Sequence, residues 1–335
     1  MGAIAEEEEV PGQLSEEQRL IEYHKRGYTW PPEPEMYKPN TDGWRKLYNQ
    51  RFDQAAFLET LDEAYNLWIV SVTSAFVQPN FTENGWGLTR APDELVQTLR
   101  KTVRSAYEDG DYREEGEVDV IDGLSPIFID RPELVERVLH ELLPMHEAWA
   151  GISLQPHLAY GFRLYRNESS LLMHIDKSDT HVISCILHID SSDDAEPWPI
   201  VIEDYTGKTN EIVLTPGDML FYESSKCLHG RPTKFIGSWY SSVFVHYFPT
   251  NPEWQEIDHH LEANYAVPEH WVDTPEGEPQ YPEVEMYGAA FREPSCPNNW
   301  CNLADAIRYH GPAKKDYVLT AGSSIYPLWR QRDEL

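Results

Sequence analysis

A histidine and an aspartate two residues apart, His174 and Asp176, stand at the end of a run whose composition is typical of a β-strand. Residues two apart in a strand point to the same face, so the imidazole and the carboxylate would lie side by side. A second histidine, His229, follows another strand-like run. Two histidines and one carboxylate can hold Fe(II) and leave coordination positions open for dioxygen and a co-substrate. We therefore expect these three residues to be metal ligands and the catalytic centre.

The segment that would position these ligands is rich in short strands. Runs of β-branched and aromatic residues, separated by the turn signals Asp204–Gly207 and Thr215–Asp218, begin near Leu154 and continue to Phe248. So many strands so closely spaced indicate a β-sandwich or a barrel. The predicted strands cover residues 159–165, 171–174, 181–189, 199–203, 211–214, 219–222 and 238–248.

The chain on either side of this segment has a different texture. Residues 1–14 are predicted to be a disordered acidic tail, and Ser15–Gln18 resembles a capping box that opens a short helix through Lys25. Apolar residues at helical spacing predict helices at 53–77, 92–107 and 133–149. We therefore expect a mainly helical region over 15–153, a β-rich core over 154–250, and an irregular, Pro- and Trp-rich extension over 251–335.

The composition argues against two kinds of partner. The formal net charge is -30, and no basic patch of the kind that binds nucleic acid is visible in the sequence. No apolar run reaches the length that a membrane span needs. We expect neither nucleic acid nor a membrane span, while a basic polypeptide would suit the acidic charge.

Two features point to the secretory route. Cys296 and Cys301 have a spacing that can close a small disulfide, which requires an oxidising compartment. The last four residues, Arg332–Leu335, resemble the Lys-Asp-Glu-Leu type of endoplasmic-reticulum retrieval signal. We therefore predict the lumen of the endoplasmic reticulum as the location, the alternative being an acidic tail that ends in Leu by chance.

The order of these features resembles the prolyl-hydroxylase-like branch of the Fe(II)/2-oxoglutarate-dependent dioxygenases. The resemblance is carried by His174-Ile175-Asp176, by the strand 181–190 that follows it, by His229, and by the end of the last strand, Val245-His246-Tyr247-Phe248. It covers roughly residues 155–250. It implies an α+β fold with a double-stranded β-helix (jelly-roll) core, N-terminal helices packed on it, and an irregular C-terminal extension.

The resemblance also implies residues that contact 2-oxoglutarate. Tyr165 matches a Tyr of the family that contacts the co-substrate, and His188 falls at the position of a second such Tyr. The family places a Lys or Arg about nine or ten residues after the distal histidine, where this chain has Ser238 and Trp239.

Another cation must therefore bind the far carboxylate of 2-oxoglutarate, if this co-substrate is used. Arg231 is favoured because a guanidinium can make two hydrogen bonds to a carboxylate. Tyr240 aligns with the missing cation when the end of the last strand sets the register. Lys234, Arg163 and Arg166 are the next candidates in the sequence.

The activity implied is hydroxylation, with peptidyl proline as the substrate class that the resemblance indicates and a small molecule as the other option. Fe(II), 2-oxoglutarate and dioxygen would be required, and the resemblance allows ascorbate as a further cofactor. Two alternatives remain open. One is a non-catalytic metal-binding or partner-binding β-barrel that has lost its co-substrate anchor. The other is a cupin-type dioxygenase without 2-oxoglutarate, in which His181 or His188 would be an additional ligand.

Overall fold

The structure is a computed structural model of the chain, and it describes residues 21, 24–25, 33–116, 118–256, 259 and 275–329. The acidic tail predicted for residues 1–14 lies outside these residues. Most of the helix expected from Ser15 to Lys25 also lies outside them, as does the C-terminal Arg332–Leu335. The location in the endoplasmic reticulum therefore stays a prediction.

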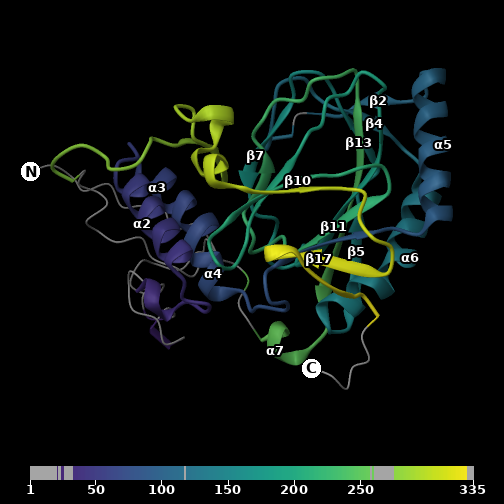
Figure 1. Cartoon of the computed structure of the whole chain (residues 1–335). Coiled ribbons are helices and arrows are strands. Elements are labelled where there is room, and N and C mark those ends of the chain that lie inside the picture. The colour runs from purple at the N-terminus through teal and green to yellow at the C-terminus, as the bar shows by residue number, and fades with distance from the viewer. Residues whose placement is uncertain are drawn as a thin grey trace, which may run out of the picture.

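Strands β6 to β13 form two sheets at the centre of the molecule (Figure 1), and buried side chains from both sheets fill the space between them. All seven predicted strands are found among them, with ends displaced by a few residues, and β12 is the one strand of this set that was not predicted. The strands are β6 (Phe162–Tyr165), β7 (Ser170–His174), β8 (Ile183–Ser191), β9 (Ile200–Glu203), β10 (Thr209–Val213), β11 (Asp218–Tyr222), β12 (His229–Arg231) and β13 (Tyr240–Pro249).

The strand order identifies the fold. One sheet contains the order β11-β8-β13-β6 and the other the order β7-β12-β9-β10, with antiparallel pairing throughout these two sets. Among β6 to β13 the chain crosses between the sheets at almost every connection, and in this set β9 and β10 alone are consecutive neighbours within a sheet. This arrangement is the double-stranded β-helix, or jelly roll, so the predicted fold class is confirmed.

Further short strands from both ends of the chain extend the two sheets. The first sheet gains β1 (Trp86–Arg90), β2 (Arg113–Glu114), β4 (Ile127–Ile129), β5 (Leu154–Ala159), β17 (Tyr317–Thr320) and β18 (Ser324–Pro327). The second gains β3 (Ile121–Asp122), β14 (Glu285–Tyr287), β15 (Ala290–Arg292) and β16 (Ile307–His310). The regions on both sides of the core thus contribute strands as well as helices and irregular segments, and the boundaries at 153 and 250 stay predictions.

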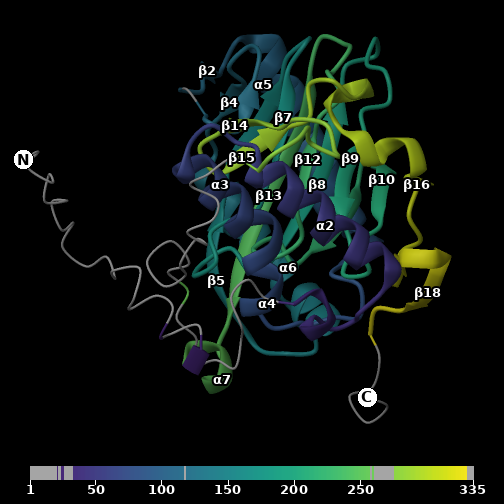
Figure 2. The same cartoon turned by 90° about the vertical axis from the view of Figure 1, so that its left-hand side faces the viewer.

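Helices cover both outer faces of the jelly roll. Figure 1 shows α2 to α4 on one side and α5 and α6 on the other, and Figure 2 shows α2 and α3 in front of the sheet with β7, β12 and β9. The longest helices are α2 (Asp42–Ala56), α3 (Leu61–Trp68), α5 (Asp93–Asp109) and α6 (Pro132–Ala150), and α3 continues directly into the π-helix η2 (Ile69–Thr73) and the short α4 (Ser74–Val77). The short ones are η1 (Pro34–Met36), α7 (Pro252–Gln255), η4 (Pro297–Asn299), η5 (Cys301–Asp305) and η6 (Ala321–Ser323).

Local sequence explains where these helices begin and end. Helix α5 buries residues at helical spacing, and it ends at Gly110, whose φ of 71° is the left-handed conformation that glycine adopts without strain. The helical spacing predicted over 53–77 is interrupted after α2. There Thr60 caps α3 by accepting a hydrogen bond from the Glu63 amide (3.2 Å), so a new helix starts.

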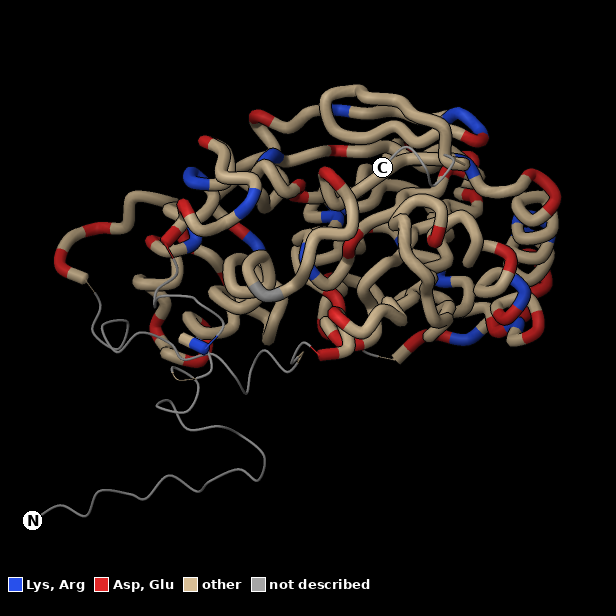
Figure 3. The backbone as a smooth tube through the Cα atoms, turned by 90° about the horizontal axis from the view of Figure 1, so that it is seen from below, with Lys and Arg blue, Asp and Glu red and all other residues tan. Residues whose placement is uncertain are grey.

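Charge is spread over the whole described backbone. Figure 3 shows Asp and Glu along every part of it, with Lys and Arg interspersed rather than gathered on one face. No helix among the described residues is long and apolar enough to cross a membrane. Cys296 and Cys301 form a disulfide, as their spacing predicts.

Candidate metal centre and co-substrate cavity

The three predicted metal ligands meet at one end of the jelly roll. His174 is the last residue of β7 and His229 the first of β12, and the two are direct partners across this antiparallel pair. Asp176 follows β7, where its amide donates to the Ser224 carbonyl (2.8 Å). The ligand atoms of the three residues all lie within 4.8 Å of one another. Asp176 Oδ1 lies 3.7 Å from His174 Nε2 and 3.9 Å from His229 Nε2.

Both imidazoles are held in the tautomer that a metal requires. His174 Nδ1 donates to the Leu172 carbonyl (2.7 Å) and His229 Nδ1 donates to the Cys227 carbonyl (2.8 Å), which leaves each Nε2 lone pair facing Asp176. Burial lowers the pKa of both histidines to about 4, so both are neutral at pH 7. Two neutral nitrogen donors and one carboxylate fit a divalent metal ion such as Fe(II).

A polar network lies on the other side of the carboxylate. Ser184 Oγ lies 2.6 Å from Ser224 Oγ and 2.8 Å from His246 Nδ1, and this histidine nitrogen is 3.8 Å from Asp176 Oδ2. Asp176 Oδ2 itself is buried without a hydrogen-bond partner. Burial raises the pKa of Asp176, and a bound cation would oppose that shift by favouring the ionised form.

A cavity of about 250 Å³ adjoins the triad. Its inner wall includes Tyr165 from β6, Ile186 from β8 and Phe244 from β13, while the exposed Tyr160 and Lys177 also line it. Tyr165 is fully buried and its hydroxyl has no hydrogen-bond partner. The cavity can therefore admit a small molecule to the metal side of the jelly roll and offer it one unused hydroxyl group.

The other predicted co-substrate residues lie together behind Tyr165, which is the direct partner of Tyr240 between β6 and β13. The Arg231 guanidinium lies 4.8 Å from the centroid of the Tyr240 ring, and its Nη2 donates to Tyr240 Oη (3.4 Å). His188 stacks on Tyr240, with ring centroids 4.1 Å apart. The structure thus gathers Tyr165, His188, Arg231 and Tyr240, but only Tyr165 lines the cavity.

Arg231 is buried without an opposite charge. It is 1% exposed, its Nη1 donates to the Trp198 carbonyl, and its guanidinium lies 4.6 Å from the Trp198 ring centroid. Among the residues that the structure describes, no carboxylate forms an ion pair with it. A buried cation without a counter-ion is costly, so the site favours an anionic ligand beside it.

The remaining candidate cations are already paired. Arg163 lines the cavity, and its Nε and Nη2 donate to the two carboxylate oxygens of Glu115 (2.7 and 2.6 Å). Arg166 pairs with Glu114 and the exposed Lys234 with Glu168. The sequence analysis ranked Arg163 behind Arg231 as a candidate for binding the far carboxylate. Its position in the cavity depends on strand pairing, which residue spacing does not reveal.

The histidines proposed as additional ligands are not part of the triad. Within the described residues, the group of ligand atoms close enough to share an ion there consists of His174, Asp176 and His229. His181 lines the cavity and packs against His246, with ring centroids 4.1 Å apart. His188 Nδ1 donates to the Ser241 carbonyl (3.0 Å). Sequence reasoning named His246 only as part of the last strand and did not name Ser184; the two lie behind Asp176 because β8 and β13 pair.

Comparison with known proteins gives likenesses at the level of structure alone. No protein-family model matches the sequence, and no curated protein matches it. The chain is similar to a prolyl-4-hydroxylase from Pseudomonas putida, at 15% identity over 53% of this chain and 99% of that one, with a TM-score of 0.39. It is also similar to a prolyl hydroxylase from Trichoplax adhaerens in complex with a peptide fragment of the hypoxia inducible factor oxygen degradation domain. That likeness has 13% identity over 62% and 93% of the two chains and a TM-score of 0.39.

A third similar structure is HygX from Streptomyces hygroscopicus with nickel and 2-oxoglutarate bound, at 11% identity over 55% and 95% of the two chains and a TM-score of 0.36. Two of these three structures are prolyl hydroxylases. The fold itself is assigned from the strand order and pairing described above.

Proposed function

We propose that this protein is an Fe(II)- and 2-oxoglutarate-dependent hydroxylase. The observation that carries the proposal is the juxtaposition of two sites in one jelly roll. Two neutral imidazoles and a carboxylate converge at the cavity, and an unpaired guanidinium, Arg231, is buried behind its inner wall. The first arrangement suits a metal ion with open coordination positions, and the second suits the far carboxylate of a dicarboxylic acid.

When bound, Fe(II) with 2-oxoglutarate and dioxygen supplies an oxidation in which one oxygen atom enters the substrate and the other enters succinate, with release of carbon dioxide. His174, Asp176 and His229 would hold the metal ion. The unpartnered Tyr165 hydroxyl would donate a hydrogen bond to the co-substrate. Arg231 would bind the far carboxylate after a local rearrangement of the inner wall. The apolar side chains of Ile186 and Phe244 line the cavity and would keep water from the bound co-substrate there.

For the substrate we propose peptidyl proline, on the strength of the sequence resemblance. The proposal is compatible with the acidic composition, which favours a basic polypeptide over an acidic one. A protein that binds the metal but turns over nothing would instead support the non-catalytic alternative. An assay with added 2-oxoglutarate distinguishes the proposed enzyme from a cupin-type dioxygenase, because only the proposed enzyme converts 2-oxoglutarate to succinate.

The metal ligands provide the first test. We expect His174→Ala, Asp176→Ala and His229→Ala each to abolish succinate production and to weaken Fe(II) binding by roughly tenfold or more, because each removes one of three protein ligands. Metal binding is measured by anaerobic titration, and turnover by succinate release with proline-containing peptides. His140→Ala is the matched control, because His140 lies on the exposed face of α6. Full iron occupancy in two of the three ligand variants would rule out the assignment.

A further inference from the structure

Two serines and a histidine form a chain of polar contacts behind the Asp176 carboxylate. Ser224 Oγ donates to the His181 carbonyl (2.7 Å), and Ser184 Oγ lies 2.6 Å from Ser224 Oγ. His246 Nδ1 lies 2.8 Å from Ser184 Oγ. Ser184, Ser224 and His246 are at most 3% exposed, and Ser184 and His246 are direct partners across β8 and β13. The pairing of the sheet therefore keeps these side chains together.

The hydrogen atoms of this chain can be placed in only one way. Each serine hydroxyl has a single hydrogen to donate, and the three contacts need three hydrogens. Ser224 donates its hydrogen to the His181 carbonyl, so the hydrogen between the two hydroxyl groups comes from Ser184. The remaining contact then requires that His246 Nδ1 carries a hydrogen and donates it to Ser184. The two serines thus determine the tautomer of His246.

This tautomer places an N–H group beside the carboxylate. His246 Nδ1 lies 3.8 Å from Asp176 Oδ2, which is buried and has no hydrogen-bond partner among the described residues. The other oxygen, Oδ1, is the one that faces His174 and His229. An N–H dipole at this distance attracts the far carboxylate oxygen, whereas the lone pair of the other tautomer would repel it. The two oxygens of Asp176 therefore have different surroundings.

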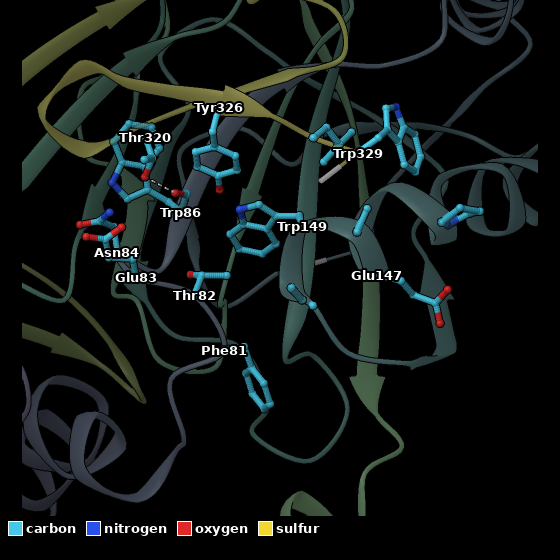
Figure 4. A pocket seen from close by; sticks show the side chains of 15 residues that line it. Phe81, Thr82, Glu83, Asn84, Trp86, Glu147, Trp149, Thr320, Tyr326 and Trp329 are labelled. Carbon is cyan, nitrogen blue, oxygen red and sulfur yellow. Dashed lines mark hydrogen bonds between the residues drawn. The ribbon is translucent and has the colours of Figure 1, made fainter. Parts of the chain in front are cut away.

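The backbone of Asp176 is held by the same chain of residues. Its amide donates to the Ser224 carbonyl (2.8 Å). The residue before Ser224, Glu223, accepts hydrogen bonds from the amides of Phe81 and Thr82 (3.1 and 2.8 Å), which belong to the loop before β1. Figure 4 shows this loop beside a second cavity, of about 660 Å³, whose lining contains no residue of the triad. Ser224 is thus fixed to a part of the molecule that is independent of the metal-binding cavity.

We propose that His246 is the positioning residue of the Asp176 carboxylate, and that Ser184 and Ser224 keep its N–H group on the carboxylate side. His246 holds Oδ2 away from the two imidazoles, so that Oδ1 alone is presented to a metal ion and a coordination position stays open. Loss of a group that orients a metal ligand typically weakens metal binding by roughly 10–100-fold. This inference rests on the proposed function for the metal ion, but not for the co-substrate or the substrate.

The test adds Co(II) alone to the full chain, without 2-oxoglutarate or peptide. It measures the affinity and the visible absorption of the bound ion, which depends on the coordination geometry. We expect His246→Phe, which keeps a ring and removes the N–H, to weaken Co(II) binding by about tenfold and to change the spectrum. His246→Asn should restore the affinity to within about threefold, because its amide N–H can take the place of the Nδ1–H. Ser184→Ala should weaken binding by about threefold to tenfold, since the ring can then adopt the other tautomer.

Ser242→Ala is the matched control for Ser184→Ala. Ser242 lies on β13, and its hydroxyl is buried and makes no hydrogen bond within the described part of the chain, so Co(II) affinity should not change. Equal affinity and spectrum in wild type and His246→Phe, with similar melting temperatures, would overturn the inference. A loss in His246→Phe that His246→Asn does not restore would also overturn it, because ring packing rather than the N–H would then be responsible.

The inference and the proposed function fail in different ways. Co(II) binding that is lost in the three triad variants but unchanged at His246 would overturn the positioning role and leave the hydroxylase intact. Co(II) binding that depends on His246, in a chain that forms no succinate, would overturn the hydroxylase and support the positioning role. A wild-type chain that binds no Co(II) would overturn both.

Discussion

Arg231 is the residue on which the use of 2-oxoglutarate depends. Its guanidinium lies 4.6 Å from the Trp198 ring centroid and 4.8 Å from that of Tyr240, and it has no carboxylate partner among the described residues. The direct partner of Tyr240 across the sheet is Tyr165, which does line the cavity. Tyr165 also packs on Trp198, with ring centroids 5.0 Å apart, so the inner wall of the cavity and the buried cation share aromatic neighbours that would have to rearrange for a carboxylate to reach Arg231.

We expect Arg231→Ala to raise the 2-oxoglutarate concentration for half-maximal succinate production by roughly tenfold or far more, because a charged hydrogen-bond partner is worth about 2–5 kcal/mol when the other charge is buried. Arg231→Lys should restore only part of the affinity, since an ammonium cannot make the bidentate contact. Fe(II) binding should change little in both variants. Unchanged half-saturation in Arg231→Ala would move the anchor to Arg163, which lines the cavity together with Lys177, and Arg163→Gln should then have the larger effect.

At the scale of the element, Gly230 determines how close β12 can come to β7. A Cβ at this position would lie 2.7 Å from the Leu172 carbonyl oxygen and 2.8 Å from that of Leu171. These distances are too short for real contacts, and backbone atoms of a paired strand cannot move aside easily. The register of the two strands already shifts between His229 and Arg231, on either side of this glycine.

Gly230→Ala should therefore push β12 away from β7 and displace His229 from His174. We expect weaker Fe(II) binding together with a lower free energy of unfolding, by about 1–3 kcal/mol, which is the range for overpacking. The measurements are metal titration and urea denaturation. Gly277→Ala is the control for glycine exchange, because a Cβ there meets nothing within 4 Å, although its φ of 112° adds local strain. Wild-type metal affinity in Gly230→Ala would show that strand spacing does not limit the triad.

Helix α6 contains a buried histidine that makes the fold sensitive to acid. His146 is fully buried between Phe221 and Tyr247, and burial lowers its pKa to about 3. The unfolded chain therefore binds this proton at a higher pH than the folded one. The stability associated with His146 is complete above pH 6.5 and is lost as the pH falls toward 3, at up to about 1.4 kcal/mol per pH unit.

We expect His146→Leu to reduce the slope of the unfolding free energy against pH between about 6.5 and 3, measured by denaturant titrations at several pH values. The same exchange at the exposed His140, six residues earlier on α6, is the matched control. The other buried histidines will keep part of the slope in both proteins. If the unfolding free energy depends on pH in the same way in wild type and His146→Leu, protonation of His146 does not destabilise the fold in acid.

The elements that the sequence predicted well are those whose pattern is local. Helices α5 and α6 lie within a few residues of the predicted ranges because apolar spacing, proline at the start and glycine at the end all agree. Strand β1 was not predicted, since its five residues gain their place only by pairing with β11 and β17, far away in the sequence. For the same reason the triad was found from residue types and spacing, whereas the pairing of Tyr165 with Tyr240 was not.

At the scale of the whole molecule, one buried ion pair joins the N-terminal helices to the C-terminal extension. Arg51 of α2 and Glu293, which follows β15, have fully buried side chains, and Arg51 Nη1 lies 2.8 Å from Glu293 Oε1. Gln50 and Gln54 also donate to this carboxylate oxygen, at 2.7 and 2.8 Å. The Cys301 amide donates to the other oxygen (2.7 Å), so the disulfide-linked loop is held at the same place.

Both partners of this pair are far from water, so the loss of one leaves an uncompensated charge. We expect Arg51→Met to lower the free energy of unfolding by roughly 3–5 kcal/mol, because Glu293 would be buried without its cation. Glu293→Gln alone should also destabilise, and combining it with Arg51→Met should cost less than the sum of the single changes, since the double variant removes both members of the pair. Arg45→Met is the control: Arg45 pairs with the exposed Asp42 on the same helix, and such surface pairs contribute about 0–1 kcal/mol. Denaturant unfolding measures all four variants. Arg51→Met could lower the free energy of unfolding no more than Arg45→Met does. The surrounding aromatic contacts, rather than the charge pair, would then hold α2 to the C-terminal extension. One such contact is that of the Arg51 guanidinium with the Trp300 ring, whose centroid is 4.7 Å away.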